Sequence, residues 1–195
     1  FFDREGYLVL PGILLPSHLE DLLEELHAIQ AAAEAQAVEA AATSSWDVNH
    51  SGADSNQCTF ALARDSRGEP THPLQLHKAQ GIALKSQKVQ QLLRSPPLAT
   101  AAAELVRRGL PSESLPGRDG RLEVDAFGTK FFPVPAGSPG SVSWHDDNYY
   151  FGTTRSHTVS CAVYLRDVRA RSGCLRVLPG SHHDASVGSG RERLY

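Results

Sequence analysis

The sequence contains no methionine, which is not expected of an unprocessed translation product. Because translation starts with methionine and this chain starts Phe1-Phe2-Asp3, we expect a fragment of a longer protein. The chain also lacks an apolar run that could span a membrane and a basic-then-apolar signal at its start. These absences favour an intracellular, cytoplasmic protein and exclude a membrane partner.

Strong charge of either sign is also missing. The formal net charge is −3, and aromatic residues make up only 7% of the chain. Such a chain gives no sign of a surface for nucleic acid or an anionic membrane, and scattered aromatics do not form a base-stacking platform. We therefore expect a small-molecule partner and no nucleic acid, while the oligomeric state is not set by the sequence.

Cysteine is scarce as well. The three cysteines, Cys58, Cys161 and Cys174, are odd in number, and their spacing fits neither a zinc site nor a disulfide framework. Cys161 and Cys174 lie in apolar, strand-like runs, where a free cysteine is usually a small buried hydrophobe. This usage indicates a reducing compartment.

Helical patterns dominate the first 110 residues. Ser17-His18-Leu19-Glu20 has the S-x-x-E pattern of a capping box, and leucines at helical spacing lead from it into an alanine-rich segment. A second helix is predicted from Leu76 to Leu93, and a third after Pro96-Pro97 that ends at Gly109. Residues 43–73 between them predict a long loop with a strand near Cys58 to Ala63.

After residue 120 the patterns change to those of strands. Residues 121–134 alternate between two faces, and the runs 157–168 and 173–180 are strand-like, with a turn from Arg169 to Gly173 between them. Helices followed by strands predict an α+β chain whose β part is a sandwich, a jelly roll or a barrel.

The run SWHDDNYYFG, residues 143–152, places a histidine beside two aspartates. On a strand, His145 and Asp147 would share one face, about 7 Å apart along the backbone and within reach of one ion. Two histidines and one carboxylate form the facial triad of non-haem Fe(II) oxygenases. The alternative is a β-turn in which Asp146 or Asp147 caps backbone N–H groups. The tripeptide alone does not decide between the two.

Several motifs in order resemble the phytanoyl-CoA dioxygenase family of Fe(II)/2-oxoglutarate oxygenases. The opening FDREGYLVLPGILLPSHLEDL is similar to the start of that family, and the later matching pieces are Trp144 to Phe151, Val159 to Leu165, Ser172 to Leu175 and Val177 to His182. The resemblance implies an α+β fold, a cupin-like double-stranded β-helix (jelly roll) with N-terminal helices packed outside. We expect a single domain over 1–195, with 1–110 mainly helical and 120–195 forming the first part of a barrel that this chain leaves incomplete.

The same resemblance implies that His145 and Asp147 are catalytic iron ligands, with 2-oxoglutarate and O2 as cosubstrates and ascorbate as an accessory reductant. The family's third ligand is a later histidine, followed by an arginine that pairs with 2-oxoglutarate. We expect both beyond Tyr195, which predicts that the 195-residue chain alone is inactive. His182 belongs to a PGSH turn that does not supply the distal ligand in the family, so a turn or pocket-rim role is expected, and His157 is expected at the entry of a strand.

Two further positions match family residues near the cosubstrate. Lys78 matches a lysine on the helix before the barrel, although an exposed surface lysine is the alternative interpretation. Thr129 matches a residue that faces the cosubstrate, with Lys130 as its outward neighbour. Asp146 stands where the family most often has glutamine, and the strand period turns it away from the metal.

The resulting hypothesis is a non-haem Fe(II)- and 2-oxoglutarate-dependent dioxygenase that hydroxylates a small-molecule or acyl substrate. A halogenase with the same centre replaces the carboxylate ligand by a small residue, and Asp147 argues against it. A non-catalytic jelly-roll binding module that has lost the metal site stays open as the alternative.

Overall fold

The computed structural model describes residues 1–42, 52–53, 58–110, 122–134, 144–147 and 158–183, and the chain divides into two compact units. The motif unit combines Phe1–Ile13, Pro96–Val124 and Ser141–Tyr195, and the sheet unit combines Leu14–Ser95 and Asp125–Gly140. Each unit takes segments from both the helical and the strand-like half of the sequence. The expected single domain therefore stays a prediction.

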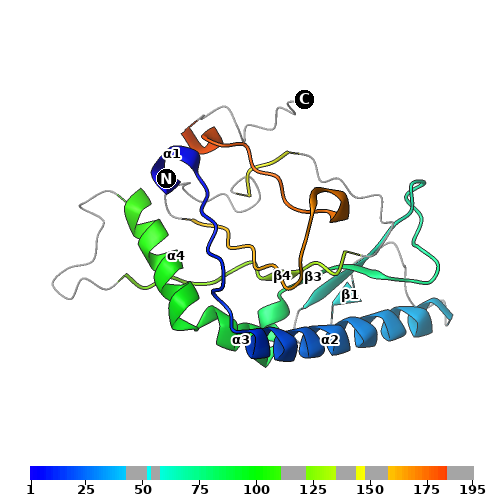
Figure 1. Cartoon of the computed structure of the whole chain (residues 1–195). Helices are drawn as coiled ribbons and strands as arrows, with labels where there is room; N and C mark the ends of the chain where they lie inside the picture. Colours follow the sequence, from blue (N-terminus) through cyan, green and yellow to red (C-terminus); the bar gives the residue numbers. More distant parts are fainter. Residues whose placement is uncertain (43–51, 54–57, 111–121, 135–143, 148–157, 184–195) are drawn as a thin grey trace. The chain divides into compact units, whose positions relative to one another are not determined.

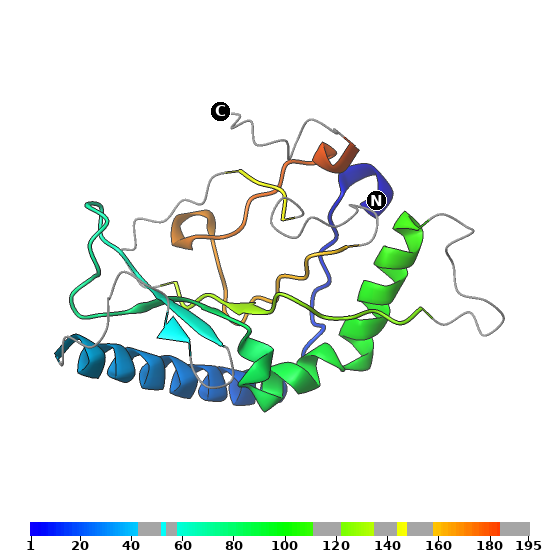
Figure 2. The same cartoon turned by 180° about the vertical axis from the view of Figure 1, so that it is seen from behind.

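The sheet unit is a small antiparallel sheet with a long helix beside it. Figures 1 and 2 both show the helix α2 running alongside the sheet. The sheet has the order β1-β2-β3-β4, and every neighbouring pair is antiparallel. The elements are α2 (Pro16–Ala42), β1 (Gly52–Ala53), β2 (Thr59–Leu62), β3 (Leu76–Gln80), the 3-10 turn η1 (Ile82–Leu84), α3 (Gln87–Leu93) and β4 (Lys130–Phe131).

Helix α2 follows the predicted apolar stripe. It begins at Pro16, which needs no hydrogen-bond acceptor for a backbone N–H and suits the first helical position. Ser17 therefore lies inside the first turn and not before it, so its predicted capping position is wrong by two residues. One face of the helix is buried, through Leu22, Leu26, Ile29, Ala33 and Ala37.

Strand β3 is the main departure from the predicted secondary structure. The sequence predicted one helix from Leu76 to Leu93, whereas Leu76–Gln80 is a strand and only Gln87–Leu93 is α-helical. On β3, Lys78 pairs with Ala61 and Leu76 with Leu62, so β3 has one extra residue there. This bulge shifts the strand alternation by one. Leu76 and Ala79, three residues apart, are consequently both fully buried and imitate a helical stripe.

Polar contacts fasten α2 to the elements that follow it. The carboxylate of Glu34 accepts a hydrogen bond from the backbone N–H of Leu76 at 2.8 Å, and that of Glu25 accepts one from the N–H of Lys88 at 3.2 Å. Ser86 is fully buried and caps α3 by accepting a bond from the N–H of Val89 at 3.0 Å. Backbone groups that would otherwise be unpaired are thereby satisfied inside the core.

The described part of the motif unit contains α1 (Phe2–Glu5), α4 (Pro96–Gly109) and the 3-10 turns η4 (Ala170–Ser172) and η5 (Ser181–His183). The predicted end of the third helix at Gly109 is confirmed. Figures 1 and 2 show α1 beside η5. The N–H of Gly180 donates to the carbonyl of Glu5 at 2.9 Å, and His182 Nε2 lies 3.0 Å from the carbonyl oxygen of Asp3.

Of the strand-like runs after residue 120, only one contains a strand, β4, within the residues that the structure describes. Residues 158–168 and 174–178 are not assigned as strands, and in 122–134 only Lys130–Phe131 is. The turn between the two runs is confirmed as η4, closed by Gly173 at a φ of 79°. A mixed helix-and-sheet structure is thus confirmed, and within the residues that the structure describes its sheet is small and open, so the expected jelly roll stays a prediction.

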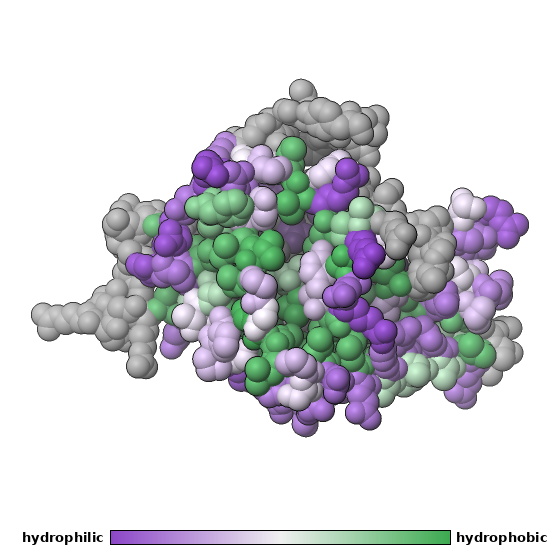
Figure 3. Space-filling view, viewed as in Figure 1, coloured by the Kyte–Doolittle hydropathy of each residue, from purple (hydrophilic) through white to green (hydrophobic). Residues whose placement is uncertain are grey.

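The buried hydrophobic core lies in the sheet unit. Within the described part of the motif unit, no hydrophobic side chain is fully buried, and several large ones are exposed, among them Tyr164, Val168, Leu175, Val177 and Leu178. Figure 3 shows apolar residues exposed among the polar ones. The three cysteines, all of them in the described ranges, form no disulfide, and the expectation of a buried Cys161 is wrong because this residue is exposed. None of the helices in the described ranges is long and apolar enough to cross a membrane.

The contact between α1 and η5 can be tested at Gly6. Gly6 has a φ of 79°, and a Cβ added there would overlap the His182 ring, whereas Gly12 has a φ of 69° and nothing near an added Cβ. Both Gly6→Ala and Gly12→Ala should cost about 1–2 kcal/mol for the left-handed backbone. Gly6→Ala should cost about 1–3 kcal/mol more, because the ring must move. Urea denaturation checks this, and equal losses for the two variants would contradict the docking of His182 on Gly6.

Candidate functional site

The structure brings His145 and Asp147 together in the motif unit. His145 Nε2 lies 3.4 Å from Asp147 Oδ1, and both side chains are partly exposed, at 36% and 39%. This distance is long for a direct hydrogen bond. A metal bound by both atoms at about 2.1 Å, with the bonds at right angles, would hold them roughly 3 Å apart. The separation is therefore close to that of two neighbouring ligands on one metal.

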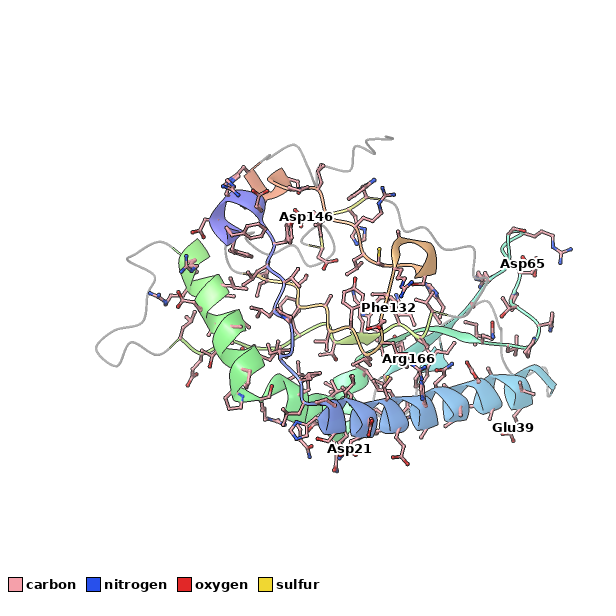
Figure 4. All side chains as sticks on the ribbon, in the orientation of Figure 1. Asp21, Glu39, Asp65, Phe132, Asp146 and Arg166 are labelled. Atoms are coloured by element: carbon pink, nitrogen blue, oxygen red, sulfur yellow. The ribbon has the colours of Figure 1, made fainter. Side chains whose placement is uncertain are left out.

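The local backbone that presents the pair is not a strand. Trp144 lies in a bend and Asp147 in a turn, so the predicted strand geometry is absent from the described residues 144–147. Asp146, labelled in Figure 4, stands between the two candidate ligands in the sequence and is half-buried. The strand period therefore does not decide which way Asp146 points, and its predicted outward orientation stays a prediction.

The carboxylate of Asp147 has a second partner that the sequence did not indicate. The hydroxyl of Ser160 donates a hydrogen bond to Asp147 Oδ2 at 2.5 Å. The two carboxylate oxygens of Asp147 thus have different partners: Oδ1 lies beside the imidazole of His145, and Oδ2 accepts the hydrogen bond from Ser160. Ser160 is 13 residues away in the chain. No local spacing rule could connect it with Asp147.

An imidazole nitrogen and a carboxylate oxygen are a donor pair that suits Fe(II). In chemistry and in separation, His145 and Asp147 fit two positions of an iron site. Within the described ranges, no cluster of three His, Cys, Asp or Glu side chains could hold a metal. His182 Nε2 contacts the Asp3 carbonyl, which favours the expected turn role, and His157 lies outside the described residues. A third ligand is not among the described residues.

Lys78 and Thr129 belong to the sheet unit. Lys78 lies on β3 and not on the predicted helix, directly beside the bulge. Because the bulge turns Leu76 and Ala79 into the core, Lys78 and its partner Ala61 lie on the opposite face of the sheet. The extra residue, His77, packs edge-on against Phe132, which Figure 4 labels, with ring centroids 6.3 Å apart. Bulges often re-aim a side chain beside a functional site.

Thr129 is engaged with the backbone that follows β3. Its hydroxyl accepts a hydrogen bond from the N–H of Ala83 at 3.1 Å, and its carbonyl accepts one from the N–H of Gly81 at 2.7 Å. These bonds hold the corner between β3 and η1. Lys130, which the sequence turned outward, pairs with Gln80 and shares the face of Lys78 by strand alternation. The cosubstrate role of Thr129 stays a prediction.

Cysteine chemistry is not favoured beside the motif. Cys161 follows Ser160 directly, and partial desolvation raises the pKa of its thiol. A nucleophilic cysteine needs a lowered thiol pKa, since the thiolate is the reactive form. The candidate functional groups are therefore His145 and Asp147, and not the thiol of Cys161.

Comparison with known proteins gives one match. A model of the family described as phytanoyl-CoA dioxygenase (PhyH) matches residues 2–192, which is nearly the whole chain. No curated protein matches the chain, and no solved structure does. The family match includes both compact units and the SWHDDNYYFG run.

Proposed function

Because the chain belongs to the phytanoyl-CoA dioxygenase family, we propose that it is a non-haem Fe(II)- and 2-oxoglutarate-dependent dioxygenase. We propose further that it hydroxylates a small-molecule or acyl substrate. Members of this family are generally dioxygenase-like enzymes that depend on Fe(II) and 2-oxoglutarate. The observation that carries the proposal is the separation of 3.4 Å between His145 Nε2 and Asp147 Oδ1 within a chain of that family.

His145 and Asp147 would hold the iron through Nε2 and Oδ1. Bound Fe(II) would supply the O2 chemistry that couples decarboxylation of 2-oxoglutarate to hydroxylation of the substrate. To act as a ligand, His145 must present a neutral Nε2 lone pair, and Asp147 must be ionised. The carboxylate also contributes a negative charge beside the imidazole, which favours binding of a cation over a neutral molecule.

Lys78 is the proposed contact for an acidic cosubstrate. It is half-buried on the face of the sheet opposite Leu76 and Ala79, which belong to the core, and a lysine there offers a positive charge to a carboxylate. We take this sheet as one wall of a jelly roll, with α2 on its outer face and Lys78 on its inner face. The packing of α2 against β3 supports that arrangement, because the family's helices lie outside the barrel.

Formation of succinate tests the proposed function. Full-length protein supplied with Fe(II), 2-oxoglutarate, ascorbate and O2 should release succinate and CO2, and omission of Fe(II) should abolish the release. Chelation with EDTA followed by addition of Fe(II) should restore it. Succinate formation that is indifferent to Fe(II) would contradict the proposal.

A non-catalytic binding module is the second candidate. It is favoured by the presence of only two candidate ligands in the part of the chain that the structure describes. Such a module would bind a small molecule without consuming 2-oxoglutarate at any Fe(II) concentration. The succinate assay therefore separates the two candidates, while Asp147 at the ligand position argues against a halogenase.

A further inference from the structure

Ser160 contacts the candidate metal site through a hydrogen bond to one of the two carboxylate oxygens of Asp147. Its hydroxyl donates to Oδ2 at 2.5 Å, while Oδ1 of the same carboxylate lies 3.4 Å from His145 Nε2. Asp147 is otherwise partly exposed, and an exposed carboxylate can rotate about its side-chain torsions. The hydrogen bond from Ser160, which is itself exposed, favours the orientation in which Oδ2 faces the serine.

The division of the two oxygens has a chemical consequence. A carboxylate can bind a metal through one oxygen or through both. With Oδ2 engaged by the serine hydroxyl, only Oδ1 is directed to the same place as the imidazole nitrogen. Carboxylate ligands of metal sites are commonly held by such outer hydrogen bonds, which orient the ligand and tune its basicity.

We propose that Ser160 is a positioning residue that holds Asp147 as a one-oxygen ligand beside His145. The inference rests on the proposed function, because it assigns a role toward the metal that His145 and Asp147 would bind. Ser160 does not touch the metal in this role and acts through Asp147 alone. The same hydrogen bond connects the segment 158–164 with the turn that contains His145 and Asp147. Both belong to the motif unit, and the two bonded residues are 13 positions apart in the sequence.

Binding of Mn(II), which is redox-inert under these conditions, provides a readout that does not depend on turnover. Free Mn(II) is counted by electron paramagnetic resonance as it is titrated into full-length protein without 2-oxoglutarate. Ser160→Ala should weaken Mn(II) binding by roughly 10–100-fold, the usual effect of removing an outer partner of a ligand. Ser160→Thr keeps a hydroxyl and should restore most of the affinity.

The matched control is Ser95→Ala. Ser95 also donates its hydroxyl locally, to the carbonyl of Leu92 at 2.7 Å, but it belongs to the sheet unit. This variant should bind Mn(II) like the wild type, and thermal melting should show that all variants fold. A second titration with 2-oxoglutarate present shows whether Ser160 acts on the metal or on the cosubstrate.

The outcomes separate this inference from the proposed function. If Mn(II) binding requires His145 and Asp147 but Ser160→Ala leaves it unchanged, the positioning role is overturned and the proposed function stands. Unchanged Mn(II) affinity with weakened 2-oxoglutarate binding also overturns it, because Ser160 would then serve the cosubstrate. If the wild type binds no Mn(II) through His145 and Asp147, both the inference and the proposed function fail.

Discussion

Replacing His145 or Asp147 by alanine should reduce succinate formation by more than the roughly 10–100-fold that is typical of changes outside the ligand set. Each change removes one of the two donor atoms that lie 3.4 Å apart, so the metal loses one of the protein ligands that hold it in position. The rate of succinate release under saturating Fe(II) and 2-oxoglutarate measures the effect. Excess Fe(II) should not restore either variant, since a lost ligand is not replaced by mass action alone.

Asp146→Gln is the matched control for this pair. It removes a carboxylate from the same short segment and introduces the residue that the family most often has between its two ligands. The variant should retain succinate formation within a few-fold of the wild type. If Asp146→Gln and Asp147→Ala lost activity equally, the general negative charge of the segment and not a specific ligand would matter. That result would contradict the assignment of Asp147.

Leu76→Ala should cost about 2–5 kcal/mol of the free energy of unfolding. Leu76 is fully buried, and its side chain fills the core of the sheet unit at the bulge of β3. Truncation leaves a cavity that the sheet cannot close easily, because Leu62 and the α2 carboxylate of Glu34 hold the strand in register. Urea denaturation followed by circular dichroism measures the loss.

Leu84→Ala serves as the comparison, since Leu84 is 58% exposed in the neighbouring 3-10 turn. Its cost should stay within about 1 kcal/mol, because most of its surface remains in water. Equal costs for the two leucines would show that Leu76 is not part of a packed core. The assignment of Leu76–Gln80 as a bulged strand against α2 would then be wrong.

The elements that could be predicted from the sequence are those whose signals are local. The leucine stripe of α2 and the glycine that ends α4 each depend on residues within a few positions of one another, and both are found. Strand β2 within the predicted loop is found as well. The error at β3 has a definite cause, because the bulge spaces the buried Leu76 and Ala79 as a helix would.

The candidate site also contains residues that local sequence patterns identify and residues that they do not. His145 and Asp147 are two residues apart, so a motif could identify them before their side-chain distance was known. Ser160 could not be identified, because its partnership with Asp147 depends on how the chain returns after 13 residues. The position of Lys78 opposite the core face also depends on the pairing of β2 with β3, which no helical or strand period reveals.

Fe(II) binding to the double variant His145→Ala, Asp147→Ala tests the central claim most directly. Anaerobic equilibrium dialysis of full-length protein should give about one tightly bound Fe(II) per chain for the wild type, because a facial triad holds one metal. The double variant should bind none at the same concentration while it keeps the wild-type circular dichroism spectrum. If iron binding survived the loss of both side chains, the assignment of His145 and Asp147 as the metal ligands would be contradicted.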